Sequence, residues 1–221
     1  MTIIGAVTVG QSPRVDVTAD IAPILDGHAQ LYEAGAMDGM TGSELAAIAP
    51  EPGDYVLVSR LRDGSHVRFA KKHILGRMQA AIDDLVARGA ETILVLCTGE
   101  FGEALTAPVP LLYPDRVLAA VVPTLSDNIT VVVPDETKRA QSERHWTSLV
   151  SRMNAVAANP YLGTGDIERA IIEIEAGGAD LVVLDCIGYS AEMRDLIRQR
   201  TGARVLLPRT LMARLALELV T

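Results

Sequence analysis

Cysteines, aromatic residues and long apolar runs are all scarce in this chain of 221 residues. It has two cysteines, one tryptophan, two phenylalanines and five tyrosines, so its core must be built mainly from alanine, valine, isoleucine and leucine. No segment has the apolar length of a membrane-spanning helix, and residues 1–10 lack the basic start of a signal peptide. We therefore expect a cytoplasmic protein with reduced thiols and no membrane partner.

Basic residues are also in the minority. The chain has 28 aspartates and glutamates against 20 lysines and arginines, a formal net charge of −8, and no basic run. This balance argues against a nucleic-acid partner, because such proteins neutralise phosphates with basic surface. The four histidines have no metal-ligand spacing, so we expect no metal site.

The two cysteines occupy equivalent positions in a sequence motif that occurs twice. Residues 89–99 read GAETILVLCTG and residues 178–188 read GADLVVLDCIG, with Cys97 and Cys186 in matching positions. A continuous apolar run of this length is typical of a strand buried on both faces of a parallel sheet. Ligands of such sheets bind beyond the carboxyl ends of the strands. Both thiols are therefore expected at a binding edge.

Strand and helix signals alternate along the chain, which is typical of a wound α/β fold. Besides the two cysteine strands, we predict strands at 2–9, 29–34, 55–60, 67–69, 129–133, 154–157 and 204–207. Helices are predicted at 15–25, 41–49, 71–88, 115–121, 135–152, 164–176, 189–200 and 210–220. The duplicated phrase predicts two pseudo-symmetric parallel-sheet halves, residues 1–118 and 119–207, with the ligand cleft between them. The C-terminal helix within 208–221 is expected to pack back on the first half.

The chemistry of thiols suits proton transfer near neutral pH, because both the thiol and the thiolate are accessible there. Both cysteines are interpreted as lying at strand-to-helix junctions, where backbone N–H groups favour an anion. Two thiols on opposite sides of a cleft could act on one carbon, one removing a proton and the other returning one. This would be a racemase or epimerase with neither metal nor organic cofactor.

Three motifs carry a resemblance to a known family. They are Thr8-Val9-Gly10-Gln11-Ser12-Pro13-Arg14, the hairpin Leu61-Arg62-Asp63-Gly64, and Leu184-Asp185-Cys186-Ile187-Gly188. Together they resemble the AroM family over almost the whole chain. The paired cysteine phrases, the two halves and the length look like the wider superfamily of aspartate, glutamate and hydantoin racemases.

The resemblance implies which residues form the site. Cys97 and Cys186 match the two proton-transfer positions of the superfamily. The residues expected to hold a substrate are Gln11, Ser12 and Arg14 in the first loop, Thr98 and Gly99 after Cys97, and Gly188 and Tyr189 after Cys186. Tyr189 could instead pack as core. Racemases of this group usually have Asp-Ser or Asn-Pro in the first loop and Asn-Thr after the first cysteine, which this chain lacks. The difference argues against an amino-acid substrate, and Arg14 favours a more anionic one.

Several functions are compatible with these residues. Racemisation or epimerisation of a small carboxylated metabolite comes first, because both thiols are present. A decarboxylase would need one thiol as proton donor, and a maleate-type isomerase would use one as a nucleophile. A metabolite sensor would bind without turnover, and a redox protein would form a reversible Cys97–Cys186 disulfide. Members of the superfamily are often dimers, so the resemblance leads us to expect a homodimer here.

Overall fold

The computed structural model describes residues 2–221, which divide by their internal contacts into two compact units. The first unit extends to Tyr113 and includes Met212–Thr221. The second unit comprises Pro114–Leu211. The final helix, α8 (Pro208–Val220), therefore begins in the second unit and ends in the first.

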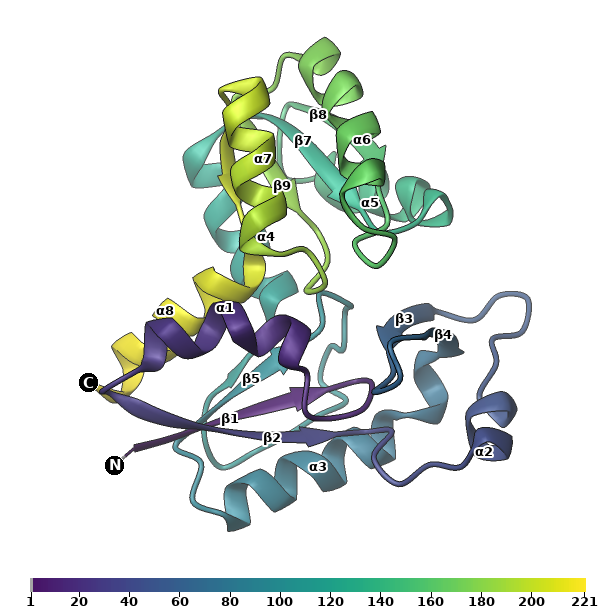
Figure 1. Cartoon of the computed structure of the whole chain (residues 1–221), viewed down its shortest axis with the longest axis vertical. Helices are drawn as coiled ribbons and strands as arrows, with labels where there is room; N and C mark the ends of the chain where they lie inside the picture. The colour runs from purple at the N-terminus through teal and green to yellow at the C-terminus, as the bar shows by residue number, and fades with distance from the viewer. Residues whose placement is uncertain (1) are drawn as a thin grey trace. The chain divides into compact units, whose positions relative to one another are not determined.

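A four-stranded parallel sheet forms the centre of the first unit, in the order β2-β1-β5-β6. Its strands are β1 (Thr2–Thr8), β2 (Ala29–Gly35), β5 (Thr92–Leu96) and β6 (Leu111–Leu112). Helices α1 (Val15–Leu25) and α3 (Leu75–Ala87) lie on opposite faces of β1 and β2 (Figure 1). The remaining elements are α2 (Gly42–Ala47), η1 (Lys71–His73) and the antiparallel hairpin of β3 (Val56–Arg60) and β4 (His66–Ala70).

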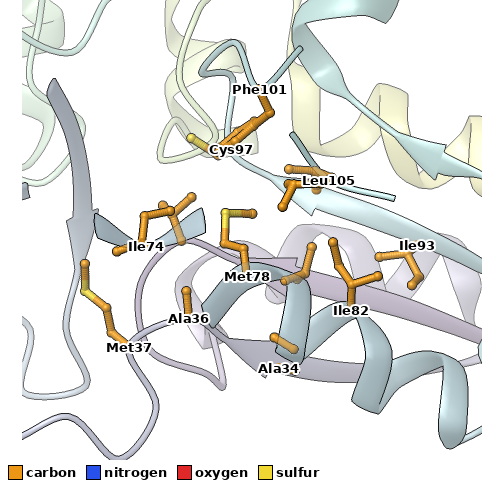
Figure 2. Packing of buried hydrophobic residues seen from close by; sticks show 14 of the residues in the cluster. Ala34, Ala36, Met37, Ile74, Met78, Ile82, Ile93, Cys97, Phe101 and Leu105 are labelled. Carbon is orange, nitrogen blue, oxygen red and sulfur yellow. The ribbon is translucent and has the colours of Figure 1, made fainter. Parts of the chain in front are cut away.

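The core of the first unit is assembled from the sheet, α3 and the hairpin. All five residues of β5 are buried, as a strand covered on both faces requires. Figure 2 shows Met78 and Ile82 of α3 within this core, and Cys97 beside Phe101 at its edge. Cys97 thus follows directly from a strand whose position is fixed by packing on both sides.

The second unit repeats this arrangement with a parallel sheet in the order β10-β9-β7-β8. Its strands are β7 (Asn128–Val133), β8 (Arg152–Ala157), β9 (Leu181–Leu184) and β10 (Arg204–Leu206). Its helices are α4 (Pro114–Leu125), η2 (Glu136–Lys138), α5 (Arg139–Trp146), α6 (Thr164–Gly177) and α7 (Ala191–Thr201). Read in the reverse direction, the second sheet has the order β8-β7-β9-β10, which corresponds strand by strand to β2-β1-β5-β6 in the first. Strands β5 and β9 therefore occupy equivalent positions. The predicted α/β fold with two parallel-sheet halves is confirmed.

Three predicted helices have clearly different limits in the structure. The helix expected over 71–88 is divided into η1 and α3. The helix expected over 115–121 is longer, because α4 continues through Pro123 to Leu125. Proline at position 123 removes the donor that would bond the Ala119 carbonyl, so the last turn of α4 forms without that hydrogen bond. The helix expected over 135–152 is divided into η2 and the short α5, because β8 already pairs with β7 from Arg152 onward. Within residues 2–221, no helix combines the length and apolarity that a membrane crossing needs.

Candidate active site at the two cysteine turns

The first cysteine lies at the carboxyl end of β5. Leu96, the last residue of that strand, pairs with Thr8 at the end of β1, so the loops after both strands start side by side. Cys97 is 8% exposed, and its Sγ accepts a hydrogen bond from the backbone N–H of Gly99 at 3.4 Å. We refer to residues 97–99 as the Cys97 turn.

The second cysteine repeats this geometry in the second unit. It follows β9 by two residues, is also 8% exposed, and its Sγ accepts from the N–H of Gly188 at 3.4 Å. We refer to residues 186–188 as the Cys186 turn. A donor pointing at sulfur stabilises the thiolate more than the thiol, whereas burial of the sulfur acts in the opposite direction.

The chain after the two turns differs, and one expectation is wrong. Helix α7 follows the Cys186 turn, with the Ser190 hydroxyl accepting from Met193 N–H at its start. No helix follows the Cys97 turn, because residues 98–110 are turns and irregular chain leading into β6. Two prolines, Pro108 and Pro110, and Gly102 with a positive φ of 55° keep this segment from forming a helix.

The glycine of each turn lies against a tyrosine that the sequence analysis did not assign to the site. A Cβ on Gly188 would lie 2.7 Å from the Tyr161 hydroxyl, and one on Gly99 would lie 3.8 Å from Cε1 of Tyr55. The Tyr55 hydroxyl also accepts from Glu100 N–H at 3.1 Å, immediately after the Cys97 turn. Neither tyrosine lies near its cysteine in sequence, so only the fold reveals the contact.

The loop after β1 contains three of the predicted substrate contacts. Ser12 is buried and donates from its backbone N–H to Asp38 Oδ1 at 2.8 Å, and its hydroxyl donates to Oδ2 of the same carboxylate. Gln11 accepts at Oε1 from Arg62 N–H at 3.0 Å. Arg62 also reaches Ser12 O and Asp38 from the tip of the β3–β4 hairpin. The hairpin therefore covers and fixes this loop.

Arg14 is buried, and it already engages a carboxylate. Its Nε and Nη2 donate to the two oxygens of Asp16 at 2.9 and 2.8 Å, and Nη1 donates to the hydroxyls of Thr8 and Ser59 at 3.3 Å each. The backbone N–H of Arg14 donates to Glu33 at 2.6 Å. Burial raises the pKa of Glu33, and the hydrogen bond from Arg14 partly offsets that rise. A substrate carboxylate at Arg14 would therefore have to share or replace Asp16.

The remaining predicted residues separate into exposed and buried positions. Thr98 is partly exposed, next to Cys97. Tyr189 is fully buried and donates to Ala158 O at 2.6 Å, so its hydroxyl already has a protein acceptor. Burial raises the pKa of Tyr189 well above its usual value, and the nearby charges of Cys186 and Asp185 add to the rise. These surroundings agree with packing as core.

The predicted residues form one group in each unit. In the first unit, Gln11, Ser12 and Arg14 lie in or next to the loop after β1, and Thr98 and Gly99 follow Cys97 after the neighbouring strand β5. Gly188 and Tyr189 adjoin Cys186 in the second. No group of three or more histidine, cysteine, aspartate or glutamate side chains among residues 2–221 is arranged to hold a metal ion.

A buried arginine next to the Cys186 turn was missed from the sequence. Arg209 is 1% exposed, and its Nε and Nη2 donate to Ile187 O at 3.0 and 2.6 Å. It follows Pro208 at the start of α8, more than twenty residues after the turn it contacts. A buried side chain of permanent charge could have been suspected from the Pro-Arg step after an apolar strand, but its partner could not.

Several solved structures have a fold similar to that of this chain. An allantoin racemase from Pseudomonas fluorescens has a similar structure, with a TM-score of 0.62 and 18% identity over 99% of this chain and 91% of that one. The allantoin racemase from Klebsiella pneumoniae has a TM-score of 0.65 and 13% identity, over 100% of this chain and 88% of that one. The maleate isomerase Iso from Pseudomonas putida S16 has a TM-score of 0.65 and 11% identity, over 96% of this chain and 90% of that one. At these identities the likeness establishes the fold alone.

The sequence itself matches a family model over most of its length. No curated protein matches the chain. The model described as AroM protein matches residues 4–220. The fold of this chain is similar to those of solved allantoin, aspartate and glutamate racemases, and the chain belongs to the AroM protein family.

Proposed function

We propose that this protein catalyses racemase- or epimerase-type proton transfer without a cofactor, with Cys97 and Cys186 as the acid/base pair. The observation that carries the proposal is the shared geometry of the two turns. Each thiol ends an equivalent strand of an equivalent sheet, and each Sγ accepts from an N–H two residues later at 3.4 Å. A duplicated arrangement of this kind supports a paired chemical role better than core filling does.

The reaction would take place at a carbon next to a carbonyl group. One cysteine, as thiolate, takes the proton from that carbon and becomes a thiol, while the electron pair of the C–H bond moves into the carbonyl to form an enolate. The other cysteine, as thiol, gives its proton to the opposite face of the carbon and becomes a thiolate. Protons and charge balance without an external reactant, and the ordinary pKa of a thiol suits both roles.

The substrate in this proposal is a small metabolite with a carboxylate or a comparable polar group. Gln11 suits such a group because its amide nitrogen makes no hydrogen bond within residues 2–221, while its oxygen is held by Arg62. Thr98 supplies a partly exposed hydroxyl beside Cys97. Contact between Arg14 and the substrate stays a prediction, since the guanidinium is engaged by Asp16.

Hydrogen exchange into deuterated water tests the proposal directly. The protein would be incubated with separate enantiomers of amino acids, hydantoins, substituted malonates and aromatic-pathway acids, and carbon-bound protons would be followed by NMR. We expect the unaltered protein to exchange both enantiomers of one class. Cys97→Ser should block exchange of one enantiomer and Cys186→Ser exchange of the other, because each thiol acts on one face of the carbon.

The other outcomes decide between the alternatives. Exchange that survives both substitutions would overturn the proposal. Loss of carbon dioxide from malonates that depends on one cysteine would indicate a decarboxylase. A covalent adduct on one cysteine, detected by mass, would indicate a maleate-type isomerase. Tight binding with no exchange, in folded and reduced protein, would favour a sensor.

A further inference from the structure

Arg209 holds one peptide group of the Cys186 turn from the side opposite the sulfur. The Ile187 C=O and the Gly188 N–H belong to the same planar peptide unit. Arg209 donates twice to the oxygen, at 3.0 and 2.6 Å, and the N–H at the other end points to Cys186 Sγ at 3.4 Å. Fixing the oxygen therefore fixes the direction of the N–H that meets the thiol.

The same contact changes the strength of that donor. A cation at a carbonyl oxygen draws electron density through the amide and makes its N–H a better hydrogen-bond donor, and low surrounding polarity increases the effect. Arg209 is 1% exposed, so water screens its charge little. The guanidinium remains protonated at any pH at which the protein is folded.

Several ionisable groups near this turn in the described residues are acids. Asp185 precedes the thiol, Tyr189 follows it and Tyr161 lies over Gly188, and the charges of Cys186, Asp185 and Tyr161 all raise the pKa of Tyr189. Asp135 follows the neighbouring strand β7 and accepts from Thr137. When ionised, each of these acids would oppose a thiolate, whereas Arg209 favours one.

The Cys97 turn has a weaker counterpart. There Lys71 donates to Glu100 O at 2.7 Å, one residue beyond the turn, and its ammonium lies 4.3 Å from the centre of the Tyr55 ring. Lys71 is only partly buried, and its bond is to a peptide that does not supply the Gly99 N–H. The two turns thus differ in the cation that binds their backbone: Arg209 bonds the peptide that supplies the donor to Cys186, whereas Lys71 bonds a peptide beyond the Cys97 turn.

We propose that Arg209 is the positioning residue of Cys186, which orients and polarises the Ile187–Gly188 peptide and stabilises the Cys186 thiolate. Cys186 is then the proton acceptor of the resting protein and Cys97 its proton donor. This inference rests on the proposed function for those two roles alone. The ionisation of the thiol is measured without any substrate. The inference about Arg209 can therefore fail while the proposed proton transfer holds, and the proposed proton transfer can fail while Arg209 still controls the thiol.

Titration of single-cysteine proteins tests the inference. In a Cys97→Ser background, the thiolate of Cys186 would be followed by ultraviolet absorbance and by the rate of alkylation with iodoacetamide against pH. Arg209→Met should raise the pKa of Cys186 by about one unit or more, which slows alkylation near neutral pH roughly tenfold. Arg209→Lys should restore part of the shift, because it keeps the charge but cannot donate twice to one oxygen with the same geometry.

A matched control comes from the same unit. Arg139 also binds a backbone carbonyl, that of Ala155 at 2.7 Å, but away from the cysteine turn. Arg139→Met should leave the Cys186 titration where it was. A Cys186 pKa that Arg209→Met and Arg209→Lys both leave unchanged would overturn the inference. If Arg209→Met fails to fold, the two single-cysteine proteins still decide, because a Cys186 pKa equal to or above that of Cys97 would also overturn it.

Discussion

The hydroxyl of Tyr161 occupies the space that a side chain at Gly188 would need. A Cβ there would lie 2.7 Å from that oxygen, 2.8 Å from Cζ of the same ring and 2.9 Å from Cγ of Pro160. Such separations are below ordinary carbon contacts, so the ring or the Cys186 turn would have to move. Glycine at this position lets the loop after β8 lie against the turn that contains the thiol.

Gly188→Ala is therefore expected to destabilise the protein by about 1–3 kcal/mol, as other overpacking substitutions do. Urea unfolding would measure the change. Gly165→Ala is the control, because a Cβ at that position in the first turn of α6 would meet no atom within 4 Å. The double variant Gly188→Ala, Tyr161→Ala should cost less than the sum of its single changes. Equal effects of Gly188→Ala and Gly165→Ala would show that the contact does not constrain the turn.

Asp38 is expected to stabilise the loop after β1. Its carboxylate accepts from Ser12 N–H at 2.8 Å, from Gly35 N–H at 2.9 Å and from the Ser12 hydroxyl. Asp38→Ala leaves these donors without their charged acceptor and should lower the free energy of unfolding by about 1.5–3 kcal/mol.

Two further variants set the scale for this effect. Arg62→Ala removes the partly exposed ion pair with Asp38 and the hydrogen bond to Ser12 O, and should cost about 1–2 kcal/mol. Asp26→Ala, which removes an exposed carboxylate after α1, should leave stability almost unchanged. If Asp38→Ala matched Asp26→Ala in urea unfolding, the loop would not depend on this carboxylate.

The elements that the sequence predicted well are those whose signal is local. The duplicated phrases predicted β5 and β9, because strands buried on both faces need continuous apolar residues. The Asp63-Gly64 step predicted the hairpin of β3 and β4, because this pair favours a tight turn. Thr41 and Glu44 predicted a capping box, which the structure contains.

The parts that the sequence could not predict depend on distant partners. Asp38 meets Ser12 across 26 residues, and Arg209 meets Ile187 across 22. Tyr161 reaches Gly188 only because β8 and β9 both flank β7. Residue type and spacing indicate that a polar group needs a partner, but sheet order determines which one. The engagement of Arg14 by Asp16 was missed for another reason. Arg14 is the N-cap of α1 and Asp16 lies in its first turn, and a separation of two residues is not one of the spacings that place side chains together along a helix.

The Arg14–Asp16 pair should stabilise the fold through its buried charge. The side chain of Arg14 is 3% exposed and that of Asp16 is 20% exposed. Removing the carboxylate in Asp16→Leu takes away the carboxylate that the buried guanidinium binds with two hydrogen bonds, and should cost about 3 kcal/mol. The double variant Arg14→Met, Asp16→Leu should be more stable than Asp16→Leu alone, because no uncompensated charge remains.

A further variant, Asp16→Asn, addresses the predicted role of Arg14 in binding. Urea unfolding would establish the stability order, and titration with the substrate found by hydrogen exchange would establish affinity. If Arg14 holds a substrate carboxylate, Asp16→Asn should strengthen binding of anionic substrates by releasing the guanidinium. Unchanged affinity would assign Arg14 to the support of the loop.

Glu33 should make stability depend on pH in a direction opposite to most carboxylates. Its pKa is raised from 4.5, first by burial, despite the hydrogen bond from Arg14 N–H. Below the unfolded pKa the carboxyl is protonated in both states. As the pH rises, the unfolded state loses its proton first, because its pKa is the lower of the two. Ionisation therefore favours the unfolded state, and the loss of stability is complete once the pH has passed the raised native pKa. The stability of the unaltered protein relative to Glu33→Gln should therefore decrease from about pH 4.5 upward and then level off.

A second carboxylate provides the opposite case within the same unit. The pKa of Glu44 is lowered from 4.5 by hydrogen bonds from the backbone and hydroxyl of Thr41. The stability of the unaltered protein relative to Glu44→Gln should be fully present above that pH and should be lost as pH falls through the lowered native value. Urea unfolding of the three proteins at a series of pH values would measure both trends. A difference between the unaltered protein and Glu33→Gln that stays flat or grows with pH would mean that burial does not control the ionisation of Glu33.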